Sequence, residues 1–156
     1  MFLLMVGTAT SFAQETILRG AQVTKESDLV SGKPYILYYV GNQASCYVKA
    51  SSGYTYFQIA PDDNTISDEA IFIFTKEETT WKIQSQKTGK YFPTPNSIDE
   101  FGFKPAETGG SWTLNFQQDG TIAPYCGDYC LDRSNGKLHS NTIDGTFPRN
   151  VSILHS

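Results

Sequence analysis

A tyrosine-containing segment recurs three times along this chain of 156 residues, each time just after a short polar turn. Tyr47, Tyr91 and Tyr129 each lie near the start of a strand-like run. They are separated by 44 residues (47 to 91) and 38 residues (91 to 129). Such spacing indicates a fold built by repetition, because one supersecondary unit cannot bury its own apolar face. Three units are enough to close around a shared core, so the recurrence constrains the architecture more than the chemistry.

Short runs rich in aromatic and β-branched residues, separated by polar turns, follow one another from residue 34 onward. The runs expected to be strands are 35–40, 46–50, 56–59, 71–74, 81–85, 90–92, 101–103, 112–116, 121–125, 129–131, 137–140 and 151–154. Helices are not expected, because no segment of ten residues has a convincing helical period and prolines interrupt the candidates. With 39% apolar and 13% aromatic residues, the chain is expected to form one all-β globular domain.

The twelve runs fall into three groups of four, an arrangement that resembles the β-trefoil fold. The resemblance covers nearly all of residues 34–156 and implies a β-trefoil of three pseudo-repeats with four short strands each. A seven-stranded sandwich is the main structural alternative. It explains the strand content but not the recurrence of three tyrosine-containing units at similar spacing.

Residues 1–13 form a short apolar run that ends in Ser-Phe-Ala, with small residues at the two positions that a signal peptidase reads. We predict cleavage after Ala13, then a polar segment, residues 14–33, and then the folded domain, residues 34–156. A buried N-terminal strand is the alternative for residues 1–13. No later segment approaches the roughly 20 apolar residues that cross a bilayer. The expected location is therefore secreted, periplasmic or at the cell surface, without a transmembrane segment.

The charge pattern narrows the possible partners. The net charge is −4, and the basic residues form no cluster. A nucleic-acid partner is not expected, because phosphate binding normally needs a basic stripe. The acidic run 62–69 lacks the glycine and terminal glutamate of a calcium-binding loop, so no metal site and no cofactor are expected. The two histidines, His139 and His155, belong to no hydrolase motif, and we do not expect an enzyme.

Three cysteines suit an exported chain with one disulfide and one remaining thiol. Cys126 and Cys130 flank a three-residue turn. A bridge between them is favoured if the backbone brings their Cα atoms within about 6 Å. Cys46 would then serve as a buried small hydrophobic residue. Pairing of Cys46 with either of the other two is the alternative.

The third unit carries a recognisable motif. Residues 129–132, Tyr-Cys-Leu-Asp, resemble the Cys-Leu-Asp motif of ricin-type β-trefoil lectins, whose Gln-x-Trp signature has no counterpart here. In that family the aspartate accepts hydrogen bonds from sugar hydroxyls, which implies Asp132 as a carbohydrate ligand. Further polar groups in the following turn and strand are Asn135, His139, Asn141 and Asp144. The other interpretation of Asp132 is a turn residue that caps local backbone groups.

Aromatic residues divide into a core set and a surface set. Trp81 and Trp112 lie in alternating apolar patterns, where a large ring most often fills the core. Tyr54 lies in a small polar turn, residues 51–55, that would expose its ring. It is the best candidate for stacking on a sugar, with Tyr125 and Tyr129 as alternatives if their hairpin is exposed.

These observations favour a secreted, non-catalytic carbohydrate-binding module, similar to a lectin, whose partner is a glycan or polysaccharide. The alternative is a module that binds protein, such as a protease inhibitor, with the loop 60–68 as its best feature. A third possibility is an accessory domain of a larger secreted enzyme. Fold alone does not choose among these functions.

Overall fold

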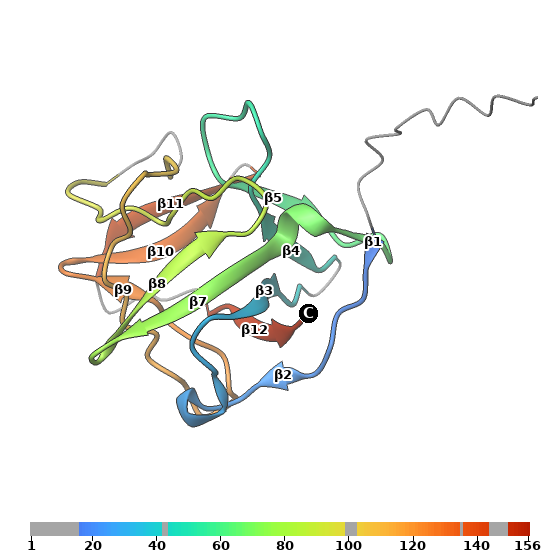
Figure 1. Ribbon diagram of the computed structural model, residues 1–156, viewed down its shortest axis with the longest axis horizontal. Helices are drawn as coiled ribbons and strands as arrows, with labels where there is room; N and C mark the ends of the chain where they lie inside the picture. Colours follow the sequence, from blue (N-terminus) through green and yellow to red (C-terminus); the bar gives the residue numbers. More distant parts are fainter. Residues whose placement is uncertain (1–15, 42–43, 99–102, 135, 144–149) are drawn as a thin grey trace, which may run out of the picture.

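The computed structural model describes residues 16–41, 44–98, 103–134, 136–143 and 150–156, and it is built from short antiparallel strands (Figure 1). The strands are β1 (Thr16–Ile17), β2 (Gln22–Val23), β3 (Lys33–Tyr39), β4 (Cys46–Lys49), β5 (Gln58–Pro61), β6 (Ile66–Ser67), β7 (Ile71–Glu77), β8 (Thr80–Ser85), β9 (Tyr125–Cys126), β10 (Tyr129–Ser134), β11 (Lys137–Thr142) and β12 (Ser152–His155). The only helical segments in these residues are two 3-10 turns, η1 (Glu26–Asp28) and η2 (Asp68–Ala70). The prediction of an all-β fold is confirmed. No helix of the described residues is long and apolar enough to cross a membrane.

The strands of the largest sheet, together with isolated bridges, form a closed ring of pairings. β12 pairs with β3, β3 with β7, and β7 with β8. A bridge between Trp81 and Trp112 continues the series. Bridges from Ile122 to Phe116 and to Val151 complete it, since Val151 directly precedes β12. The alternating inward side chains of these segments therefore share one interior.

Each recurring tyrosine lies in a further antiparallel pair. Tyr47 lies in β4, which pairs with β5; Tyr91 bridges Ala106; and Tyr129 opens β10, which pairs with β11. A triangle of backbone hydrogen bonds joins the three pairs. The amide of Phe57 donates to Phe103 O at 3.0 Å, that of Phe103 to Leu138 O at 2.6 Å, and that of Leu138 to Phe57 O at 3.2 Å. Segments that follow each of the three tyrosines thus meet at one place through similar backbone contacts.

The core contains a cluster of aromatic rings. The ring of Phe92 makes edge-to-face contacts with Phe57, Phe103 and Trp112, at centroid separations of 4.8, 5.7 and 6.2 Å. Such edge-to-face pairs contribute beyond the area they bury. Both tryptophans are fully buried, as predicted. Trp81 also donates from Nε1 to Glu26 Oε1 at 2.9 Å, which ties η1 to the core.

The N-terminal polar segment contains strands that the sequence did not indicate. β1 pairs with β6, and β2 pairs with β12 (Figure 1). Ile17 packs against a second apolar cluster on the outer side of the sheet, which includes Ile36, Tyr38 and Leu154. The Tyr38 hydroxyl donates to Asp62 at 2.6 Å; burial first, and then this hydrogen bond, raise the pKa of Tyr38. Residues 16–23 thus cover apolar surface that the ring of strands leaves outside. Residues 1–15, which contain the predicted signal sequence, lie outside the described part of the chain.

The predicted bridge between Cys126 and Cys130 is wrong, because none of the three cysteines forms a disulfide. Strand register explains why. Cys126 lies opposite Tyr129, and Cys130 lies opposite Tyr125. Consecutive strand residues point to opposite faces, so the two thiols project from different sides of the hairpin. Cys126 joins the main core, while the Cys130 thiol lies 3.8 Å from Thr142 O.

Cys46 is buried, as expected for a small hydrophobic residue. Its sulfur accepts a hydrogen bond from Arg133 Nη1 at 3.1 Å. Burial raises the pKa of the Cys46 thiol, and the Arg133 guanidinium offsets part of that increase.

Candidate functional site

The polar residues predicted from the lectin-like motif meet on the hairpin of β10 and β11. Asp132 and His139 are directly opposite each other in register, with His139 Nε2 3.8 Å from Asp132 Oδ2. Asn141 Nδ2 donates to the same carboxylate oxygen at 3.4 Å. The backbone amide of Arg133 donates to Asp132 Oδ1 at 2.7 Å. Both carboxylate oxygens therefore have neighbours within the protein.

This cluster is turned inward. Asp132 is 4% exposed and His139 is 9% exposed, while Asn141 is half-buried. The bond from the Arg133 amide is the kind of local backbone capping that the second interpretation of Asp132 predicted. Asn135 and Asp144, the other predicted ligands of this unit, lie outside the described residues. Sugar binding by Asp132 remains a prediction, and it requires the buried carboxylate to become accessible.

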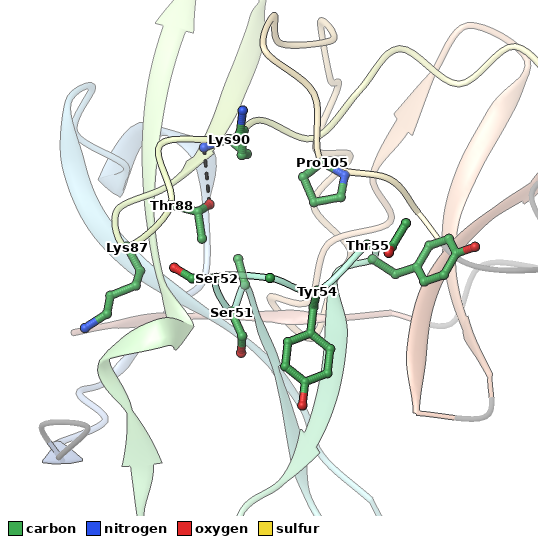
Figure 2. Close-up of a pocket in the computed structure, with 11 residues that line it drawn as sticks. Ser51, Ser52, Tyr54, Thr55, Lys87, Thr88, Lys90 and Pro105 are labelled. Carbon is green, nitrogen blue, oxygen red and sulfur yellow. Dashed lines mark hydrogen bonds between the residues drawn. The ribbon is translucent and has the colours of Figure 1, made fainter. Parts of the chain in front are cut away.

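A cavity of about 490 Å³ lies elsewhere, beside the loop that joins β4 to β5. That loop projects from the body of the molecule and carries Tyr54 (Figures 1 and 2). The Tyr54 amide donates to Ser51 O at 3.3 Å, which closes a tight turn. Gly53 has φ +83° in this turn, a conformation that glycine adopts without the cost paid by other residues. Tyr54 is 61% exposed, so the predicted surface position of its ring is confirmed.

The opposite wall is the turn after β8. Its backbone is held by Ser85, whose Oγ accepts from the Thr88 amide at 3.1 Å and whose carbonyl accepts from the Gly89 amide at 2.9 Å. The Lys90 amide donates to Thr88 Oγ1 at 3.3 Å, the dashed line in Figure 2. Pro105 forms a further part of the wall. In the view of Figure 2 the Tyr54 ring points away from Pro105 and from Thr88 and Lys90.

Hydroxyl groups dominate the lining. Six of the lining residues carry a hydroxyl, namely Ser51, Ser52, Tyr54, Thr55, Tyr56 and Thr88. The charged lining residues are Lys87 and Lys90. Hydroxyls can donate and accept hydrogen bonds, and an aromatic face covers apolar surface. This combination suits a polyhydroxylated ligand with an apolar side.

The structure separates the predicted binding residues into two places. Tyr54 lines the cavity, whereas Asp132, His139 and Asn141 do not. Tyr129, an alternative stacking residue, is half-buried and its hydroxyl donates to Asn96 O at 3.2 Å. Lys87, Thr88 and Lys90, which line the opposite wall, were not among the predicted binding residues. The described residues contain no group of three His, Cys, Asp or Glu side chains that could hold a metal ion.

The fold is similar to that of sugar-binding and sugar-cleaving proteins of known structure. A ricin B-like lectin from Macrolepiota procera, solved with lactose, aligns with a TM-score of 0.65 at 12% identity, over 83% of this chain and 99% of the lectin. A GlcNAcα1-4Gal-releasing endo-β-galactosidase from Clostridium perfringens aligns with a TM-score of 0.61 at 10% identity, over 78% of this chain and 32% of the enzyme.

A GH43 β-1,3-galactosidase aligns with a TM-score of 0.61 at 16% identity, over 87% of this chain and 28% of the enzyme. The chain thus spans about a third of the length of each glycosidase or less. No protein-family model matches the sequence, and neither does a curated protein. At these identities the comparisons establish a ricin-type lectin-like fold.

Proposed function

We propose that this chain is an exported, non-catalytic carbohydrate-binding module with a β-trefoil architecture. The observation that carries the proposal is the alignment with 99% of a ricin B-like lectin solved with lactose. The two glycosidases support it, because both act on galactose-containing glycans according to their descriptions. Fold alone does not determine function, so the argument continues from the cavity.

The three-unit architecture is supported by backbone contacts. The ring of pairings, the three pairs that carry Tyr47, Tyr91 and Tyr129, and the hydrogen-bonded triangle of Phe57, Phe103 and Leu138 each involve the three units in turn. A β-trefoil has this combination of a closed ring and three hairpins. The proposed pseudo-repeats therefore have a physical basis besides the sequence spacing.

Glycan binding is assigned to the cavity beside Tyr54. Six hydroxyl-bearing residues line it, and the Tyr54 ring is exposed at its rim. A sugar in the cavity would exchange hydrogen bonds with water for bonds with these hydroxyls, while the ring would cover its C–H face. Because such bonds replace bonds with water, single-site affinity should be weak, and several sites or copies would be needed for high avidity.

A non-catalytic role is supported by the composition of the lining. Glycoside hydrolysis normally requires two carboxyl groups that flank the bond to be cleaved. The described residues that line the cavity include no aspartate or glutamate. A sugar bound there would meet hydroxyls and ammonium groups but no general acid of the usual kind.

The experiment is a broad glycan and polysaccharide array with the chain starting at residue 14, followed by calorimetric titration of any ligand found. Replacing Tyr54 with alanine should weaken binding about 3- to 10-fold, if the stacked ring contributes about 0.5–1.5 kcal/mol. Tyr54→Phe keeps the ring and should bind within a factor of about two. An array without binding would refute the function, and unchanged affinity in Tyr54→Ala would refute the site.

The Asp132 cluster is the competing site for the same function. Asp132→Asn should leave glycan affinity unchanged if the cavity is the binding site. A loss of affinity in this variant, with Tyr54→Ala unaffected, would move the site to the third unit.

An accessory domain of a larger enzyme is the second candidate function, favoured by the alignment with about a third of each glycosidase. Mass spectrometry of the native protein distinguishes the two possibilities. A product that begins at Gln14 and ends at Ser156 would support a separate exported module. A longer polypeptide with glycosidase activity would support the accessory domain.

A further inference from the structure

We infer that the cavity beside Tyr54 binds an anionic saccharide, and that Lys90 binds its acidic group in place of Glu107. The inference rests on the proposed glycan-binding function and specifies the ligand class. The acidic group is a carboxylate, as in a uronic acid, or a sulfate. Both present oxygen acceptors to an ammonium donor.

The charge of the lining is the first argument. Both charged residues that line the cavity, Lys87 and Lys90, are cationic, and the described lining contains no carboxylate. The chain as a whole is acidic, with a net charge of −4. A third cation lies next to the cavity, because Lys137 Nζ is 4.9 Å from the centre of the Tyr56 ring. The described lining thus contributes only positive charge although the chain is acidic overall, and this favours an anion where an ammonium group is released from its ion pair.

The ion pairs that Lys87 and Lys90 form are the second argument. Lys87 pairs with Asp68 at 3.0 Å, and Lys90 pairs with Glu107. Neither acid lines the cavity. The Glu107 side chain is 82% exposed, whereas that of Asp68 is only 20% exposed. A solvent-exposed ion pair contributes little to stability, so a ligand anion can replace Glu107 at low cost.

Asp68 is a poorer leaving partner because it is more buried and follows Ser67, which caps η2. We therefore assign the anion to Lys90 and a supporting electrostatic role to Lys87. The Thr88 hydroxyl, which accepts from the Lys90 amide, holds the lysine backbone at the cavity wall (Figure 2). A sugar ring placed between this wall and Tyr54 would put its acidic substituent within reach of the ammonium group.

The test uses three probes titrated into the chain from residue 14: polygalacturonate, the same polymer fully methyl-esterified, and dextran sulfate, which carries sulfate groups but no carboxylate. Esterification removes the charge but keeps the backbone of the sugar. We expect polygalacturonate to bind at least five-fold more tightly than its ester, with affinity that falls as salt is raised. Binding of dextran sulfate that depends on Lys90 would show that sulfate also satisfies the site, and its failure to bind would restrict the ligand to carboxylates.

Three variants test whether Lys90 is the residue that binds the acidic group. Lys90→Gln should reduce affinity for polygalacturonate about five- to ten-fold and leave affinity for the ester unchanged. Lys33→Gln removes the same charge from an exposed position outside the cavity and should have no effect. Glu107→Gln should increase affinity for polygalacturonate, because it removes the competing carboxylate. Equal thermal melting temperatures establish that all three variants are folded.

Equal affinity for the acidic and esterified polymers would overturn the inference while leaving glycan binding intact. A loss in Lys33→Gln as large as that in Lys90→Gln would also overturn it, because it would indicate non-specific charge attraction. If no polysaccharide on the array binds, the proposed function fails together with the inference.

Discussion

The carboxylate of Asp132 has a structural role within the hairpin of β10 and β11. One oxygen accepts from the Arg133 amide at 2.7 Å, and the other faces Asn141 and His139. Removing a buried hydrogen-bond acceptor leaves its donors without a partner, which destabilises the folded state. An aspartate can accept hydrogen bonds from a sugar, and it can equally cap backbone groups within a hairpin. The burial of Asp132 favours the capping role.

Asp132→Ala should therefore destabilise the fold by about 1–3 kcal/mol, because it leaves buried donors without an acceptor. Urea unfolding of the unmodified protein and of the Asp132→Ala variant, followed by circular dichroism, measures the difference in the free energy of unfolding. Asp63→Ala serves as the control. The Asp63 side chain is exposed, and its carboxylate accepts hydrogen bonds from Thr65 within the same loop. An unchanged unfolding midpoint for Asp132→Ala would contradict the structural role and favour a residue held in place for a ligand.

At the scale of elements, most expected strands are present, and two of the interrupted ones contain or adjoin proline. Run 112–116 forms only isolated bridges, at Trp112, Thr113 and Phe116. Run 90–92 forms only isolated bridges at Tyr91, to Gln84 and to Ala106, and Pro93 and Pro95 follow it. Run 121–125 bridges at Ile122 and begins β9 at Tyr125, with Pro124 between them. Proline has no amide hydrogen to donate and so breaks a ladder. Most of run 101–103 lies outside the described residues.

The N-terminal strands β1 and β2 are the elements that local sequence did not indicate. Each has two residues, too few to show an alternating pattern. β2 is nevertheless integral to the fold, because Val23 is 1% exposed and belongs to the main core cluster.

Val23→Ala should lower the free energy of unfolding by about 1–3 kcal/mol, through lost burial and the cavity left behind. Val30→Ala is a matched control, because Val30 is 54% exposed and the substitution removes the same atoms. Thermal or urea unfolding of both variants measures the contrast. Equal and small effects would show that β2 is not docked against the core.

At the scale of the whole molecule, the three units depend on one another. The hydrogen-bonded triangle links Phe57, Phe103 and Leu138, and the aromatic core spans the same units. Some strand pairs join segments far apart in sequence, such as β2 with β12. The main core cluster takes buried residues from Val23 to Ile153.

Unfolding should therefore be a single cooperative transition. Tryptophan fluorescence reports on the second unit through Trp81 and Trp112, whereas far-ultraviolet circular dichroism reports on all strands. The two signals should give coincident urea curves. Separate midpoints would indicate that the second unit unfolds independently, and would contradict a shared core.

Local pattern was sufficient to predict the positions of most strands, the burial of Trp81 and Trp112, and the exposure of Tyr54, because these depend on alternation and turn residues within a few positions. The register between strands determined two features that local pattern did not predict. It placed Cys126 and Cys130 on opposite faces and turned Asp132 inward. Only the tertiary structure brought the Tyr54 loop to the Lys87–Lys90 turn, more than thirty residues away, because that contact depends on how separate units pack around one core.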